Sequence, residues 1–357
     1  MLKRRVLLAA GSASLAASTS FAQGDSSIEK VLTDLMRRHR VPSAGLTVIR
    51  NGEIAERIAI GADPQTLFEA ASISKVVTGV TVMRLVEEGR IGLDTRVNEM
   101  LRSWTLPGPG AERVTPRLLL SHRGGTTVPG FPGYVSGARL PSLAEILDGL
   151  PPANTGPVRV GWPPGEAFRY SGGGTMVLQR LLMDVAGKAY DALAGELVLA
   201  PTGMSRSGFF QPLPATESNA ATAYDLEGNP LAGRWHVYPE LGAAGLWSTA
   251  SDLARLALAI AASWQRGGLL KRTTAEQMAT RVASGPTGLG VFVYPRGSKP
   301  PYLYHYGVNA GFRSILVFAA DASFGLALMT NGEGGKPLIP AMLAALFAGY
   351  DPFRPDD

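Results

Sequence analysis

The first regular apolar pattern lies near the beginning of the chain. Its apolar positions follow the 3.6-residue period of a helix that Ser27 can cap and that ends near His39. The residues on the apolar face are Val31, Leu32, Leu35 and Met36. Residues 44–50 and 53–60 have the composition of strands, and the Asn51-Gly52 pair between them is a strong hairpin signal. The pattern therefore predicts a helix followed by a two-stranded hairpin.

The other end of the chain is also rich in strand-forming residues. Four apolar and aromatic runs are separated by turn residues, which predicts an antiparallel meander, and a helix follows them. The predicted strands are 288–294, 302–306, 312–319 and 324–330, and the predicted helix is 337–347. Because neither end offers enough strands for a sheet of its own, we expect one sheet built from both.

The stretch between the two ends has helical periodicity. The predicted helical segments are 73–88, 175–185 and 250–262. Long Pro- and Gly-rich connections, such as 106–110 and 127–134, join them. We therefore predict an α+β fold in which residues 26–67 plus 285–350 form an antiparallel sheet region flanked by helices. Residues 68–284 would be a mainly helical region inserted into it.

Residues 1–22 have the layout of a signal peptide. Three cations at positions 3–5 precede an apolar stretch over 6–17, and Ala22 ends a group of residues suited to signal-peptidase cleavage. The alternative is a short buried or anchoring helix, but this stretch is too short to span a bilayer of about 30 Å. We expect a periplasmic or secreted protein without a stable membrane anchor. Whether Arg4-Arg5 marks twin-arginine export or the general secretory route stays open.

Composition narrows the possible functions. The 357 residues are 45% hydrophobic and 18% charged, which is typical of a globular protein. Removing residues 1–22 takes away three of the 34 Lys and Arg and lowers the formal net charge from +5 to +2, so we expect no nucleic-acid partner. The absence of Cys excludes thiol catalysis and disulfides, and the four dispersed His argue against a metal centre. No cofactor is called for.

A serine and a lysine three residues apart carry the first candidate chemistry. Ser72 and Lys75 lie at the start of a predicted helix, where this spacing puts the amine beside the hydroxyl. A desolvated lysine has a lowered pKa and can activate a serine as a nucleophile. The pattern alone is weak, because Ser27 and Lys30 have the same spacing. A helix cap with a solvated lysine is the alternative.

Two later segments add candidate residues. In the first, 161–174, a Pro-rich turn delivers Tyr170 to a Gly-rich helix start. In the second, 304–314, His305 stands near the end of a strand, where glycine allows a ligand to approach closely. Taken alone, a tyrosine such as Tyr170 is more often a core residue and a histidine such as His305 is more often structural.

Together and in this order, the three pieces resemble the Ser-x-x-Lys, Tyr-x-Asn and Lys-Thr-Gly motifs of the serine beta-lactamase and penicillin-binding-protein superfamily. The resemblance is greatest to the branch of class C beta-lactamases, D-alanyl-D-alanine carboxypeptidases and family VIII carboxylesterases. Further segments that carry it are 118–125, 201–204, 243–253 and 329–332. The resemblance implies a beta-lactamase/transpeptidase-like fold with the active site in the cleft between the sheet and the helical region.

The resemblance also implies the site residues. Ser72 would be the acylated nucleophile, Lys75 its partner, and Tyr170 a general base or proton shuttle. The backbone N–H groups of Ser72 and Val308 would form the oxyanion hole. Which of Lys75 and Tyr170 takes the proton stays open. The Ser121-His122 pair looks like a dyad, but the family motif there is structural.

Two departures from the family pattern affect substrate recognition. Gly172 stands where many members have the asparagine of Tyr-x-Asn, so an amide that would hold the lysine and the substrate is missing. His305-Tyr306-Gly307 replaces Lys-Thr-Gly, and histidine is a weaker, pH-dependent anchor for a carboxylate. We expect His305, Gly307 and Gly172 to contact substrate and an ester to be preferred over a beta-lactam.

The sequence therefore favours an exported serine hydrolase of the carboxylesterase kind, acting on a small-molecule or peptide-like substrate. A beta-lactamase or D-amino-acid peptidase with the same nucleophile is the alternative. A binding or sensing domain that keeps the fold without turnover is the alternative of another class. The oligomeric state stays open. Five side chains are candidates either for the cleft or for the core: Arg123, Phe131, Tyr134, Trp247 and Phe312.

Overall fold

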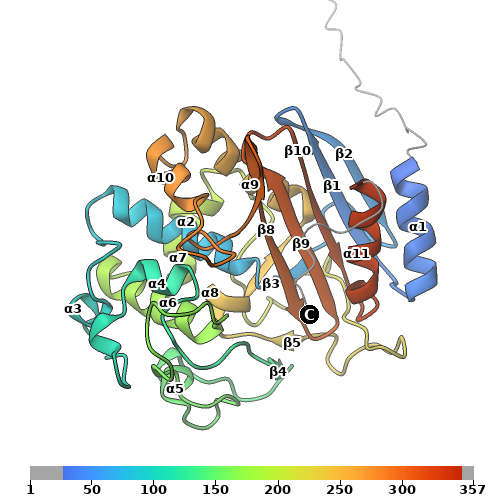
Figure 1. Ribbon diagram of the computed structural model, residues 1–357. Coiled ribbons are helices and arrows are strands. Elements are labelled where there is room, and N and C mark those ends of the chain that lie inside the picture. The colour runs from blue at the N-terminus through green and yellow to red at the C-terminus, as the bar shows by residue number, and fades with distance from the viewer. Residues whose placement is uncertain (1–26, 348–357) are drawn as a thin grey trace, which may run out of the picture.

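The computed structural model describes residues 27–347, so the predicted signal peptide, residues 1–22, lies outside the described residues. A six-stranded sheet in the order β2-β1-β10-β9-β8-β7 runs through the molecule with helices on either side of it (Figure 1). All of its neighbouring strands are antiparallel. The strands are β1 (Ala44–Arg50), β2 (Glu53–Ile60), β7 (Phe292–Arg296), β8 (Lys299–Asn309), β9 (Phe312–Ala319) and β10 (Phe324–Thr330). The pairing of β1 with β10 joins the two ends of the chain, as predicted.

Helices cover both faces of this sheet. On one face, α1 (Ser27–His39) and α11 (Gly335–Leu346) pack together and against the sheet (Figure 1). The core beneath them contains Leu32 of α1, Leu343 of α11 and Leu328 of β10, all fully buried. On the other face, α9 (Ala250–Arg266) crosses β1, β9 and β10. The prediction of an α+β fold is therefore confirmed.

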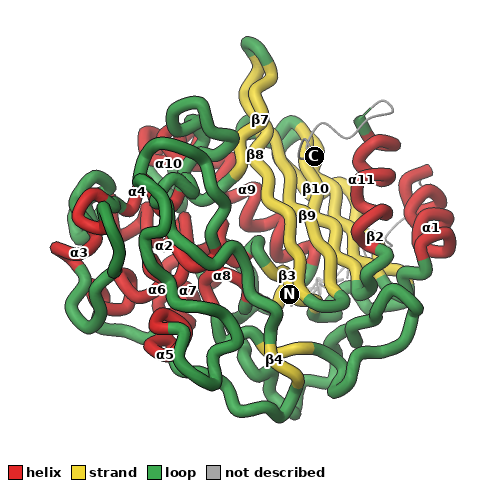
Figure 2. Tube along the Cα trace, turned by 60° about the horizontal axis from the view of Figure 1, so that its bottom comes forward, coloured by secondary structure: helices red, strands yellow, loops and turns green. Residues whose placement is uncertain are grey.

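The remaining helices gather on the α9 side of the sheet (Figure 2). They are α2 (Ser74–Glu87), α3 (Val97–Met100), α4 (Pro116–Leu120), α5 (Leu143–Asp148), α6 (Gly172–Ala186), α7 (Tyr190–Ala194), α8 (Leu241–Ala244) and α10 (Arg272–Met278). A short 3₁₀-helix, η1 (Ala111–Arg113), and a short π-helix, η2 (Gly195–Leu199), complete this region. Two small ribbons pair β3 (Phe68–Ala71) with β6 (Leu246–Ser248) and β4 (Tyr134–Val135) with β5 (His236–Val237). The β3–β6 ribbon lies between the sheet and the helices and contacts β8 and β9.

The predicted strand at 288–294 is wrong in its first half. Gly290 has φ +83°, a left-handed conformation that ends a strand, and its Cα lies so close to Gly79 of α2 that a Cβ would not fit. This close contact turns the chain before β7 begins at Phe292. In the other direction, β8 extends beyond the predicted 302–306 in both directions. The helix α1 includes Ser27 rather than beginning after it.

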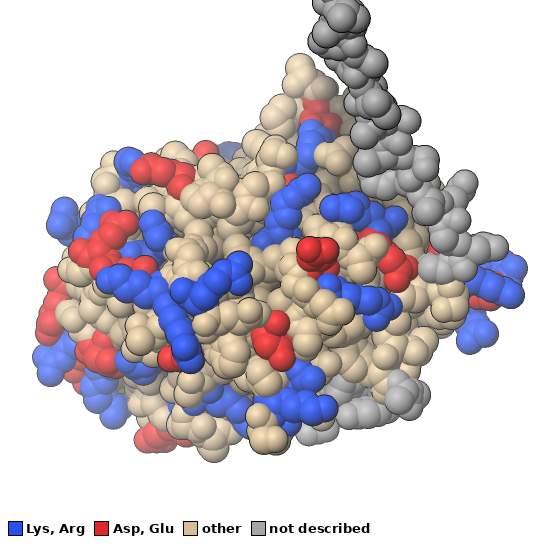
Figure 3. Space-filling model, turned by 90° about the horizontal axis from the view of Figure 1, so that it is seen from above, with Lys and Arg blue, Asp and Glu red and all other residues tan. Residues whose placement is uncertain are grey.

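No helix among residues 27–347 is both long and apolar enough to cross a membrane. On the face seen in Figure 3, Lys and Arg side chains lie among Asp and Glu side chains rather than in one large patch.

Candidate active site

Ser72 lies in the tight turn between β3 and α2. The preceding Ala71 has φ +51°, an uncommon conformation for a residue with a Cβ. Ser74 holds this turn in place, because its Oγ donates to the Ala71 carbonyl at 2.6 Å and accepts from the Leu246 N–H at 3.0 Å. Ser72 is partly exposed, whereas its neighbours on both sides are buried. The turn therefore presents one hydroxyl from an otherwise buried segment.

Lys75 lies one helical turn further on and faces Ser72. Its Nζ donates to Ser72 Oγ at 3.0 Å and to the Ala243 carbonyl of α8 at 2.8 Å. The residue is only 4% exposed, and this burial lowers the pKa of Lys75 to about 7. Desolvation penalises the charged amine. A large fraction of Lys75 is therefore neutral near pH 7 and carries a lone pair beside the serine.

Tyr170 lies beside Ser72 and Lys75. Its ring centroid lies 5.2 Å from Lys75 Nζ, and the Ser72 side chain is near enough to its phenol to affect its pKa. Burial raises the pKa of Tyr170 above its usual value, so the phenol keeps its proton at neutral pH. The structure thus brings together the three side chains that the sequence singled out. Of the lysine and the tyrosine, the lysine is the group with an accessible basic form.

His305 is buried beside these residues and is uncharged. It is 2% exposed, and its Nδ1 lies 2.6 Å from the Tyr306 carbonyl, so Nδ1 carries the proton. Burial, together with the nearby charge of Lys75, lowers the pKa of His305 to about 3. Its ring lies 6.1 Å from that of Tyr170 and 5.4 Å from that of Phe292. The sequence predicted a pH-dependent anchor for a carboxylate here, and the low pKa favours a neutral imidazole instead.

Gly307 and Val308 lie where β8 passes the end of β3. A Cβ on Gly307 would collide with Ser314 Oγ and with the carbonyl of Ala70, two residues before Ser72. Ser314 Oγ donates to this same carbonyl at 3.0 Å. Glycine therefore allows the close approach of the two strands, and Val308 is the next residue along β8, with a side chain that is 58% exposed.

Gly172 begins α6, and its surroundings are tight. A Cβ there would lie 2.9 Å from Phe131 Cε2 and 3.3 Å from the Pro129 carbonyl oxygen. Phe131 thus occupies space that the side chain of an asparagine would need. The sequence showed that the amide is missing, but not that an aromatic ring takes its place.

Sequence reasoning missed a buried polar link beneath the site. Asn309, at the end of β8, donates through Nδ2 to Glu69 Oε2 at 2.6 Å and to the Ala244 carbonyl at 3.2 Å. Glu69 is 1% exposed, and burial raises the pKa of its carboxyl well above the usual value. The Asn309 amide therefore links three elements of the site. These are β8, which carries Val308, β3, which leads to Ser72, and α8, whose Ala243 carbonyl accepts from Lys75. No local motif signals this contact, because the two side chains are 240 positions apart.

His122 packs against Tyr170 instead of forming a dyad with Ser121. Its Nδ1 accepts from the Ser171 N–H at 3.2 Å, and its ring centroid lies 4.3 Å from that of Tyr170. Ser121 Oγ donates to the Arg117 carbonyl. Burial is the main cause that lowers the pKa of His122 well below its usual value, so it too is neutral. The expected structural role of this motif fits these contacts.

The five larger side chains with an open assignment divide between the core and the site. Trp247 and Phe312 are fully buried, and their rings contact each other at 5.8 Å. Tyr134 and Arg123 are mostly buried, and Arg123 donates to the Gly165 carbonyl. Phe131 is partly exposed and covers Gly172.

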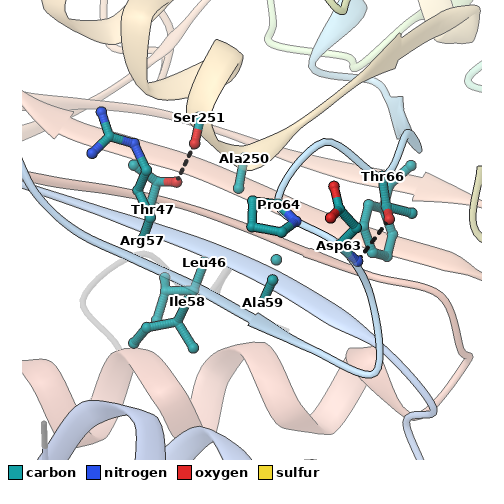
Figure 4. Close-up of a pocket in the computed structure, with 12 residues that line it drawn as sticks. Leu46, Thr47, Arg57, Ile58, Ala59, Asp63, Pro64, Thr66, Ala250 and Ser251 are labelled. Carbon is teal, nitrogen blue, oxygen red and sulfur yellow. Dashed lines mark hydrogen bonds between the residues drawn. The ribbon is translucent and has the colours of Figure 1, made fainter. Parts of the chain in front are cut away.

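A small cavity lies apart from Ser72, between β1, β2 and the start of α9 (Figure 4). Its volume is about 20 Å³, enough for a water molecule but not for a substrate. Thr47 and Ser251 face each other across one side of it, with their hydroxyl oxygens 3.3 Å apart. The cavity contains none of the candidate residues and is not the active site.

Comparison with known proteins gives a consistent result. A model of the family described as Beta-lactamase matches residues 28–348. Penicillin-binding protein 4 of Amycolatopsis lactamdurans is 27% identical over 331 residues, which cover 84% of this chain and 83% of that protein. Protein flp of Staphylococcus aureus strain N315 is 22% identical, and the match covers 85% of this chain but only 62% of that protein. The D-amino acid amidase of Ochrobactrum anthropi has a similar fold, with 20% identity, a TM-score of 0.70 and coverage of 90% of this chain and 97% of the amidase.

Proposed function

The chain belongs to the beta-lactamase family, and on that premise we propose that it is an exported serine hydrolase that forms an acyl-enzyme at Ser72. The observation that carries the proposal is the contact of 3.0 Å between Ser72 Oγ and a Lys75 amine whose pKa is about 7. A serine needs a base within hydrogen-bond reach, and a base with a pKa near the working pH is the most effective.

The first half of the reaction follows from these positions. The neutral amine of Lys75 takes the Ser72 proton while Oγ attacks the carbonyl carbon of the substrate. The backbone N–H groups of Ser72 and Val308 would stabilise the oxyanion that forms. The bond to the leaving group then breaks, and the leaving oxygen or nitrogen receives the proton from Lys75 through the phenol of Tyr170. An acyl-enzyme and the free alcohol or amine result.

The second half repeats these steps with water as the nucleophile. Water gives a proton to Lys75 through Tyr170, and its oxygen attacks the acyl carbon. The bond from the acyl carbon to Ser72 Oγ then breaks, and Oγ takes the proton back from Lys75. The carboxylic acid product departs. No cofactor takes part in either half.

An ester is the preferred substrate in this proposal. Phe131 fills the space of the missing amide beside Gly172, and His305 is neutral, so two polar contacts that would hold a beta-lactam or a peptide are not available. The resemblance to a penicillin-binding protein favours a beta-lactamase or D-amino-acid peptidase as the second candidate. A domain that binds or is acylated without turnover is the third.

Intact mass and turnover test these candidates together. The protein without residues 1–22 is exposed briefly to p-nitrophenyl butyrate and, separately, to nitrocefin, with Ser72→Ala as control. We expect rapid turnover of the ester that is lost in Ser72→Ala. Turnover of nitrocefin with negligible ester hydrolysis would reverse the order of the first two candidates. A stable adduct without turnover would favour the third, and equal reaction of Ser72→Ala would overturn the nucleophile.

A further inference from the structure

A larger pocket, of about 320 Å³, lies beside Tyr170. This volume is at the lower end of the range of about 300–1,000 Å³ typical of small-molecule sites. Tyr170 forms one part of its lining, so the pocket shares a wall with the candidate active site. The other lining residues are Thr126, Val128, Pro129, Trp162, Phe168 and Arg169. The walls are therefore mainly apolar and aromatic, with one permanent cation.

Hydrogen bonds to the start of α6 fix one wall of this pocket. Ser171 Oγ donates to the Thr127 carbonyl at 2.7 Å, and the Gly173 N–H donates to the Val128 carbonyl at 2.9 Å. Val128 has φ +63°, a conformation that is rare and strained for a β-branched residue. The fold thus holds the Val128 side chain in the wall against its local preference. Such strain persists where the surroundings fix it, which is common at binding sites.

The cation of the pocket stacks on an exposed tryptophan. The Arg169 guanidinium carbon lies 4.8 Å from the centroid of the Trp162 ring, and Trp162 is 42% exposed. Within the described residues 27–347, no ion pair or side-chain hydrogen bond engages Arg169. Stacking uses the face of a guanidinium and leaves its N–H edge free for a carboxylate.

The neighbouring polar groups do not offer an equivalent anchor. His305 is neutral, and the guanidinium of the nearby Arg123 is already engaged by the Gly165 carbonyl. Building on the proposed hydrolase function, we propose that this pocket binds an apolar part of the ester substrate that carries a carboxylate, and that Arg169 pairs with this carboxylate. The carboxylate can belong to the acyl part or to the alcohol part of the ester.

Two pairs of matched esters distinguish these sources. For the acyl part, p-nitrophenyl pentanoate is compared with the p-nitrophenyl monoester of glutaric acid. For the alcohol part, phenyl acetate is compared with 4-carboxyphenyl acetate. In the pair whose carboxylate reaches Arg169, we expect a higher kcat/KM for the anionic ester than for the neutral one. Arg169→Gln should reduce this ratio of kcat/KM values by about five-fold, the upper range for a partly solvated ion pair. High salt should weaken the preference in the same way.

Arg38→Gln is the control for net charge, because Arg38 is an exposed residue of α1, on the opposite face of the sheet (Figure 1). It should leave the preference unchanged. If the wild type shows no preference in either pair, or if Arg169→Gln leaves the preference intact, the proposal is overturned.

A binding measurement separates this proposal from the hydrolase proposal. Calorimetric titration of Ser72→Ala with phenylacetate, the anion of phenylacetic acid and not an ester, requires no turnover. Binding that weakens when Arg169→Gln is added, in a protein that hydrolyses no ester, would support the pocket while refuting the hydrolase. Ester hydrolysis with no anionic preference, and no effect of Arg169→Gln on phenylacetate binding, would refute the pocket alone.

Discussion

Replacing Lys75 with methionine tests the central feature of the site, a buried amine held partly neutral. Methionine has a similar length and no charge, so Lys75→Met removes the desolvation penalty while filling most of the space. We expect the variant to lose hydrolytic activity and to become more stable near neutral pH. The gain arises because folding forces the lysine pKa down from 10.5 to about 7.

The size of the effect follows from proton linkage. Between pH 7 and pH 10.5 the unfolded chain binds a proton at Lys75 that the folded chain does not, so wild-type stability rises with pH. The penalty is complete below pH 7, where it amounts to about 5 kcal/mol, and it disappears above pH 10.5. From pH 7 to pH 9 the wild type should recover about 2 kcal/mol of this penalty. Lys75→Met should recover none.

Urea unfolding of both proteins at pH 7, 8 and 9 measures the difference. The comparison cancels groups common to both, including Glu240, whose pKa burial raises to about 7. The stability advantage of Lys75→Met should shrink by about 2 kcal/mol across this range. Parallel stability curves would refute the reasoning, because they would mean that Lys75 keeps its ordinary pKa in the folded protein.

Three further predictions concern the surroundings of the site. Gly172→Asn should lower stability by about 1–3 kcal/mol, measured by urea unfolding, because its Cβ meets Phe131, and adding Phe131→Ala should restore part of the loss. Asn309→Leu should lower the free energy of unfolding by about 1–3 kcal/mol, because it leaves the buried Glu69 without its hydrogen-bond partner. It should also reduce kcat more than it changes KM. In a double-mutant cycle, adding Glu69→Leu should recover stability but not kcat. The pH profile of kcat/KM should rise to a plateau above an inflection near pH 7, the pKa of Lys75. His305→Gln should keep this inflection, because the pKa of His305 is about 3. A profile that flattens in His305→Gln would show that the histidine titrates instead.

The parts of the fold that were predictable are those fixed by local pattern. The strands 312–319 and 324–330 agree with the structure to the residue, because each is a run of apolar residues bounded by turn residues. The failed half of the strand at 288–294 depends on the contact of Gly290 with Gly79, more than 200 positions earlier. A sequence pattern shows that a glycine is present, but not which neighbour requires it.

The same division applies to the site. The spacing of three residues placed Lys75 beside Ser72, since the turn that leads from Ser72 into α2 brings residues three apart together. Tyr170 and His305 required a resemblance, because nothing local connects them with Ser72. The link from Asn309 to Glu69 and the ring of Phe131 over Gly172 escaped both approaches. They arise only when distant segments pack together.

The two departures from the family pattern, at Gly172 and at His305, have the same effect on the site. Phe131 fills the place of an amide, and burial keeps His305 neutral, so the centre of the site loses two polar anchors. A cationic anchor so close to Lys75 would also lower the pKa of the Lys75 amine further. The charge of Lys75 lowers the pKa of His305 in the same way. An anchor at the rim, such as Arg169 on Trp162, avoids this conflict because solvent screens it. In the proposed function, the nucleophile and its base thus lie at this centre, and the selection of a charged substrate falls to the pocket beside Tyr170.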